Sequence, residues 1–115
     1  MFFNKVFRKK DEYASTLERI IGFYPRQVSI YKQAFLHKSI LQNTELQSFE
    51  SNERLEFLGD AVLDSVISDY LYHKFPKKDE GYLTKLRSRF VSRQTLNSLG
   101  VKIGLKELMQ SNLQY

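Results

Sequence analysis

Four carboxylate side chains recur along one segment of the sequence at helical spacing. Glu53, Glu56, Asp60 and Asp64 follow one another at intervals of three, four and four residues. At about 100° per residue they fall within an arc of roughly 80° on a helix. Like charges so placed repel by a few tenths of a kcal/mol per pair, and the nearby Arg54 points about 100° away from Glu53. The row therefore suits hard oxygen ligands for a divalent cation such as Mg²⁺ or Mn²⁺.

Two other arrangements would give the same spacing. One is a solvated acidic face, and the other is a face paired with lysine or arginine side chains from another helix. Periodicity alone does not distinguish them from a metal site. The two histidines, His37 and His73, suit surface or capping roles better than general-base catalysis, because metal-activated water needs no histidine base.

The element that must carry the acidic row is predicted to be a long helix over about residues 52–75. Ser51 and Asn52 are good capping residues, and Pro76 forbids continuation. Its apolar residues cover more than one stripe, which predicts a central helix buried by others. They are Leu55, Phe57, Leu58, Ala61, Val62, Leu63, Val66, Ile67, Tyr70 and Leu71.

The remaining periodicity is also helical, so the fold is predicted to be all-α. Alternating apolar and polar strands with turn dipeptides are absent from the sequence. A polar stretch from about Leu41 to Ser51 is expected to be a loop, and about residues 1–12 a flexible start. Shorter helices are expected from Leu17 to Ile21, from Val28 to Phe35, from Asp79 to about Val91, from Ser92 to about Gly100 and from Gly104 to Gln110.

Composition limits the class of protein. The chain has 115 residues, enough for one domain with a modest core. It has no cysteine, which excludes disulfides and thiolate zinc sites and favours a reducing, cytoplasmic location. No apolar run approaches a membrane span, so no membrane partner is expected. Residues 43–71 carry seven acids and one base, whereas the segments on either side are basic, an arrangement that suits a polyanion held against a metal site.

Twelve consecutive residues, Asn52 to Leu63 (NERLEFLGDAVL), resemble the signature of the ribonuclease III family. Residues 31–39 and 75–87 resemble the family segments before and after that signature, so the resemblance covers roughly residues 25–110. It implies the helical bundle of a ribonuclease III endonuclease domain. It also implies a metal-dependent endoribonuclease that cleaves double-stranded RNA, for example ribosomal RNA precursors, in the cytoplasm.

The resemblance implies roles for particular residues. Glu56 and Asp60 fall on the catalytic, metal-ligating positions, with Mg²⁺ as the cofactor, Mn²⁺ as a possible substitute and no organic cofactor. Glu53 and Glu80 match further acidic positions implied in RNA contact or a second metal. Phe57 matches an aromatic that enters the partner subunit of a homodimer, although ordinary core packing would also explain it.

Other positions have less specific interpretations. Asp64 departs from the signature and is not expected to be a ligand. Gly59 suggests a close approach that a side chain would obstruct, because glycine within a helix costs about 1 kcal/mol relative to alanine. A row of basic residues after the signature is expected either to contact RNA phosphates or to form a solvated face. It comprises Lys85, Arg87, Arg89 and Arg93.

The family's metal site is completed by an Asp-x-x-Glu-Ala-type motif on a later helix, and nothing after Glu80 offers it. We therefore expect the chain to be the front part of a longer enzyme, truncated before the last helices and inactive or weak alone. The main alternative is a catalytically silent scaffold of the same family that binds RNA or dimerises. A helical interaction module unrelated to RNA is a further alternative.

Overall fold

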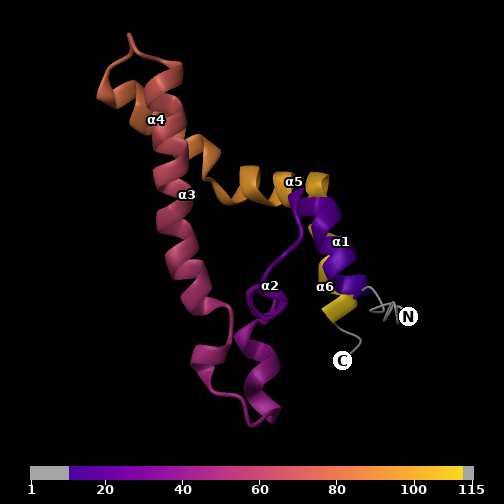
Figure 1. Ribbon diagram of the computed structural model, residues 1–115. Coiled ribbons are helices and arrows are strands. Elements are labelled where there is room, and N and C mark those ends of the chain that lie inside the picture. Colours follow the sequence, from indigo (N-terminus) through magenta and orange to yellow (C-terminus); the bar gives the residue numbers. More distant parts are fainter. Residues whose placement is uncertain (1–10, 113–115) are drawn as a thin grey trace, which may run out of the picture.

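The computed structural model describes residues 11–112, which form six α-helices and two short 3₁₀ helices (Figure 1). The described residues contain no strand, so the all-α prediction is confirmed. The first ten residues of the expected flexible start lie outside the described part, and Asp11 and Glu12 belong to the first helix and its cap. The helices do not form one compact body. The radius of gyration is 18.7 Å, against about 13 Å for a compact domain of roughly 100 residues.

The small core joins the first described helix to the last. Helix α1, Glu12–Ile21, packs beside α6, Leu105–Asn112, and both lie together in Figure 1. Tyr13, Leu17 and Leu108 are buried at this contact. Asp11 caps α1 by accepting a hydrogen bond from the Tyr13 N–H at 3.1 Å. This core therefore brings the two ends of the described part of the chain together.

Helix α2, Val28–Ala34, is followed by two 3₁₀ helices rather than by the plain loop that we expected. These are η1, Lys38–Asn43, and η2, Ser48–Glu50. Local polar contacts account for them. The His37 ring accepts from the Ser39 N–H, and the Gln47 N–H donates to the Glu50 carboxylate at 2.6 Å. His37 thus has the capping role predicted for it.

The long helix α3 runs Glu53–Lys74, within one residue of the prediction at each end. Helix α4, Glu80–Phe90, begins after Asp79, whose side chain accepts from the Tyr82 N–H at 2.9 Å. Helix α5, Arg93–Ile103, begins after Ser92 in the same way. It continues past the expected end near Gly100 and ends at Gly104, which takes a left-handed conformation with φ 88°.

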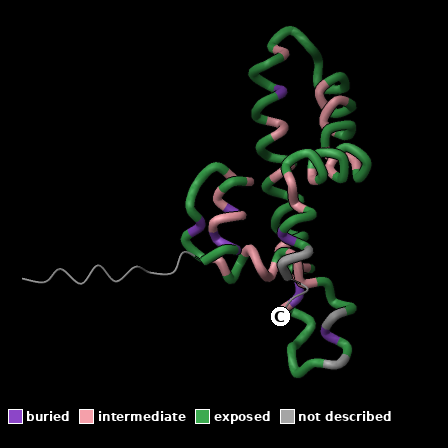
Figure 2. Tube along the Cα trace, turned by 90° about the vertical axis from the view of Figure 1, so that its right-hand side faces the viewer, coloured by how far each residue is buried: buried purple, intermediate pink, exposed green. Residues whose placement is uncertain are grey.

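The prediction that α3 is buried by other helices is wrong for this chain. Leu71 is its only buried residue, and most of the helix is exposed in Figure 2. The physical reason is that α3 packs mainly against α4, while α1, α5 and α6 pack with one another to one side. Periodicity gives the amount of apolar surface but not what covers it. One row, spaced every fourth residue, is more than half exposed: Leu58, Val62, Val66 and Tyr70.

Length alone could have suggested a membrane segment for the 22 residues of α3. Five acids interrupt its sequence, however, and within residues 11–112 no helix combines the length and apolarity needed to cross a bilayer. The exposed apolar row therefore lies on a helix that also carries charge.

The core contact gives the first test. Leu108→Ala should lower the free energy of unfolding by about 2–5 kcal/mol, because a fully buried leucine leaves both lost burial and a cavity. Urea unfolding followed by circular dichroism measures the change. The matched control is Met109→Ala on the same helix, which is exposed and should change stability by no more than about 0.5 kcal/mol. Equal effects at both positions would contradict the assigned core.

Candidate functional site on the acidic face of α3

Helix α3 presents Glu53, Glu56 and Asp60 to solvent on one face. Glu56 and Asp60 lie one turn apart, a rise of about 6 Å. Among residues 11–112 no lysine or arginine forms an ion pair with either carboxylate. Glu53 and Glu56 gain from their position in the first turn, where the helix dipole favours negative charge. Asp60 lies too far along the helix for that benefit.

Glu53 differs from the other two acids because it has a cationic partner. The Lys38 Nζ atom, from η1, lies 3.0 Å from Glu53 Oε1. Pairing with a basic residue from another segment, one of the two alternatives for the acidic face, therefore applies at this position. The two acids that remain without such a partner are Glu56 and Asp60.

The donor chemistry at Glu56 and Asp60 fits part of a magnesium site. Carboxylate oxygens are hard ligands, and Mg²⁺ commonly uses one or two carboxylates while it keeps several waters. The described residues nevertheless bring together no group of three or more aspartate, glutamate, histidine or cysteine side chains that could hold a metal ion. The face therefore offers two exposed carboxylates rather than a closed coordination shell.

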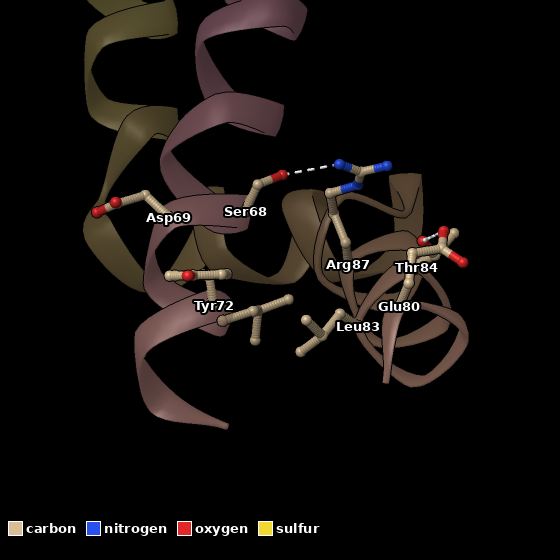
Figure 3. Close-up of a pocket in the computed structure, with 8 residues that line it drawn as sticks. Ser68, Asp69, Tyr72, Glu80, Leu83, Thr84 and Arg87 are labelled. Carbon is tan, nitrogen blue, oxygen red and sulfur yellow. Dashed lines mark hydrogen bonds between the residues drawn. The ribbon is translucent and has the colours of Figure 1, made fainter. Parts of the chain in front are cut away.

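Glu80 lies elsewhere, in a cleft of about 440 Å³ between α3 and α4 (Figure 3). Its carboxylate accepts a hydrogen bond from the Thr84 hydroxyl at 2.7 Å. The α3 residues at this cleft begin at Ser68, about 12 Å along the helix from Asp60. The structure therefore does not group Glu80 with Glu56 and Asp60 within one chain.

Arg87 lines the same cleft and ties the two helices together. Its Nη1 atom donates to the Ser68 hydroxyl at 2.7 Å, a partly buried contact that crosses from α4 to α3 (Figure 3). On α4 the side chains of Lys85 and Arg87 point about 200° apart, so they do not form one row. Lys85, Arg89 and Arg93 are exposed. Sequence reasoning missed Ser68, whose only signal was a hydroxyl within a largely apolar helix.

Three further residues complete the picture of α3. Phe57 is 83% exposed, so core packing does not explain it within this chain. Gly59 was expected to allow a close approach, but a Cβ atom there would meet nothing within 4 Å among the described residues. That expectation is therefore wrong for the isolated chain. His73 lies on the surface, with Nδ1 2.8 Å from the Asp69 carbonyl oxygen.

The family model for the ribonuclease III domain matches residues 53–114, which include the acidic face, α4 and α5. The chain belongs to the ribonuclease III family. It is similar to a protein named Ribonuclease 3 from Bacteroides fragilis, with 50% identity over 105 residues. It is also similar to proteins of the same name from Azobacteroides pseudotrichonymphae, 46% identical over 103 residues, and Carboxydothermus hydrogenoformans, 48% identical over 95 residues.

These alignments cover most of this chain but a minor part of each relative. They include 91%, 90% and 83% of the chain, and 36%, 40% and 40% of the respective relatives. The chain thus spans well under half the length of these ribonuclease III proteins. Within that span lie both acids of the candidate site and the α3–α4 cleft.

The contact between Arg87 and Ser68 yields a test of how α3 is held. Ser68→Ala and Arg87→Met should each lower the free energy of unfolding, and a double-mutant cycle should give a coupling of about 1.5–3 kcal/mol, the range for a hydrogen bond to a charged group. Urea unfolding of the four proteins measures the coupling. Ser88→Ala combined with Arg87→Met is the control, because the Ser88 hydroxyl bonds within α4. Zero coupling at Ser68 would contradict the contact.

Proposed function

We propose that the natural protein containing this chain is a divalent-metal-dependent endoribonuclease that cleaves double-stranded RNA. The observation that carries the proposal is the pair Glu56 and Asp60, exposed one turn apart on α3 without a basic partner in the described chain. Family membership gives this pair its chemical context, because the relatives that align with it are named Ribonuclease 3. The family uses divalent metal ions, and Mg²⁺ is the proposed ion.

In this proposal Glu56 and Asp60 hold the metal through their carboxylate oxygens. The bound ion would lower the pKa of a water molecule and offset charge on the phosphodiester as it is hydrolysed. Because Mg²⁺ bound by one or two carboxylates also relies on waters and substrate phosphates, we propose that the RNA and residues outside 11–112 complete its coordination shell. The products would carry 5′-phosphate and 3′-hydroxyl ends, and this chain alone would be inactive or weak.

RNA binding is proposed to use the basic residues of α4. Lys85 and Arg89 are exposed and one turn apart on α4, which suits contact with phosphates. Glu53 and Glu80 are proposed to lie near the RNA or at a second metal, and Arg87 to act indirectly by holding α4 against α3. Duplex RNA is read mainly by shape and 2′-hydroxyl groups. Ribosomal RNA precursors in the cytoplasm are the proposed substrates.

The proposed partner is a second copy of the chain. Phe57 is a large aromatic side chain that is almost fully exposed beside the acidic face. The row Leu58, Val62, Val66 and Tyr70 adds apolar surface on the opposite side of the helix. Soluble proteins rarely leave large apolar patches open, so each of these two surfaces is a candidate for contact with a partner. A homodimer through α3 would cover Phe57.

A second candidate is a catalytically silent scaffold that binds structured RNA or dimerises. The observation that favours it is that residues 11–112 bring together no group of three or more acidic, histidine or cysteine side chains that could hold a metal ion. The two candidates differ in one result. A scaffold binds duplex RNA, with affinity that falls as salt rises, but leaves it uncut in Mg²⁺.

Cleavage of duplex RNA by the full-length protein tests the catalytic proposal. Glu56→Gln and Asp60→Asn should each lower kcat by more than about 100-fold, since direct ligands matter more than the residues that merely orient them. Gel analysis of end-labelled duplex, with and without Mg²⁺, measures this. Asp64→Asn, on the same face, is the matched control and should retain activity. Normal cleavage by both site variants would refute the proposed roles.

Analytical ultracentrifugation of the full-length protein tests whether two copies associate through Phe57. Phe57→Ala should raise the dimer dissociation constant by about 30-fold or more, as for truncation of an aromatic anchor in an interface. Phe23→Ala removes another exposed phenylalanine, which lies outside α3, and should leave the dimer intact. A monomeric wild-type protein, or a dimer insensitive to Phe57, would rule out this interface.

A further inference from the structure

We propose that Asn52 and Gln33 are positioning residues that set the rotation of α3, and with it the direction of Glu56 and Asp60. The inference rests on the proposed function, since it concerns the geometry of the same acidic face. It assigns a role to the hydrogen bonds of Asn52 and Gln33 that join the end of α2 to the start of α3, here called the tie. These segments lie about 18 residues apart in sequence and contact through polar groups rather than through a shared core.

Asn52 closes the end of α2 instead of capping its own helix. Its backbone N–H donates to the Leu36 carbonyl at 2.8 Å, and its side-chain Nδ2 donates to the Ala34 carbonyl at 3.3 Å. Ala34 is the last residue of α2, where carbonyl groups lack donors from within the helix. Asn52 itself takes a helical conformation and makes no side-chain cap bond to α3. Its amide is therefore committed to the neighbouring helix.

A second tie acts on the preceding residue. The Gln33 Nε2 atom, on α2, donates to the Ser51 carbonyl at 3.2 Å. Ser51 is fully buried, its hydroxyl donates to the Ser48 carbonyl, and the Glu53 N–H donates to that hydroxyl. Ser51 thus replaces Asn52 as the side-chain cap. Two successive residues before α3 are fixed by groups from outside the helix.

Ser51 and Asn52, which these contacts anchor, lead directly into the helical turn that carries Glu56. The Glu56 N–H donates to the Asn52 carbonyl at 2.8 Å, so the first bond of the helical ladder joins the tie to a proposed ligand. The ion pair between Lys38 and Glu53 holds the same turn from η1. Among the described helices, only α4 packs extensively along α3, so the first turn of α3 depends on these contacts.

Rotation of α3 would move the acids far more than a metal site tolerates. A carboxylate about 6 Å from the helix axis moves about 2 Å when the helix turns by about 20°. Metal-ligand distances are held to about 0.2 Å. Such a turn leaves the spacing between Glu56 and Asp60 unchanged, because both lie on α3, but it moves both carboxylates relative to the proposed ligands from other parts of the protein. A helix free to turn by this amount would therefore sample positions in which the complete ligand set cannot hold the ion. The tie acts through Glu56 and Asp60 and not by touching substrate.

The experiment compares Asn52→Ala and Gln33→Met with matched controls in the full-length protein. Asn97→Ala and Gln94→Met remove the same side chains from exposed positions of α5. For the two α2–α3 variants we expect kcat to fall by about 10–100-fold and the Mg²⁺ requirement to rise, as for residues that orient metal ligands. KM for duplex RNA should stay close to wild type, because phosphate contacts elsewhere supply binding.

Two measurements without RNA accompany the assay. Amide hydrogen exchange at positions 52–56 should be faster in Asn52→Ala than in Asn97→Ala. Mn²⁺ affinity, followed by electron paramagnetic resonance, should weaken by about 10-fold or more. A merely structural role would lower the melting temperature but leave the metal requirement unchanged at temperatures where the protein is folded.

The outcomes separate this inference from the proposed function. If the wild-type protein leaves duplex RNA uncut, the proposed function fails. Amide hydrogen exchange and Mn²⁺ affinity then still test whether Asn52 and Gln33 position α3. If the wild type cuts and Asn52→Ala matches it across the Mg²⁺ titration, the positioning role is overturned. A rate loss equal to the unfolded fraction also overturns it. If Asn52→Ala does not fold, Gln33→Met tests the positioning role by the same criteria.

Discussion

The packing of α4 against α3 is the contact on which the position of the long helix depends. Leu71, the one buried residue of α3, lies at the cleft between these helices, together with the hydrogen bond from Arg87 to Ser68. The rings of Phe75 and Tyr82 meet edge to face at 5.6 Å where the two helices join. These contacts all lie in the second half of α3. The acidic face lies in the first half, so its geometry must be maintained from the other end.

That division explains why polar contacts rather than a core surround the start of α3. Packing against α4 leaves the first half of α3 without an extensive helix partner among the described residues. Backbone carbonyls left open at the end of α2 offer fixed acceptors with strong directional preference. Asn52 and Gln33 use or reinforce that geometry. Apolar side chains would pack there without specifying one angle so closely.

Local signals in the sequence predicted most element boundaries. Asp79 and Ser92 cap helices as expected because a side-chain oxygen next to a helix start has an obvious donor to accept from. Gly22 ends α1 with φ 85°, which favours glycine. The acidic face of α3 was likewise predictable, since it requires only helical spacing. The family signature supplied the proposed roles of Glu56 and Asp60, which spacing alone left open.

Properties that depend on neighbours were not predictable in the same way. The prediction that α3 is buried was wrong because the spacing of apolar residues does not specify which element covers them. Ser68 and Arg87 are 19 residues apart, and no local pattern joins them. Asn52 looked like a cap for its own helix, yet its amide serves α2, because the choice depends on which carbonyls come near after folding.

The exposed row on α3 has a consequence for how the chain behaves in solution. Leu58, Val62, Val66 and Tyr70 extend over about 18 Å of helix. Sulfate is excluded from protein surfaces and strengthens burial of apolar groups, whereas added salt of any kind weakens contacts with phosphates. The apolar row and the basic residues of α4 respond oppositely to the same buffer. Ammonium sulfate would therefore favour contacts between apolar rows of different copies while it weakens the proposed contacts with RNA, so salting-out and elution from a polyanion are expected to coincide.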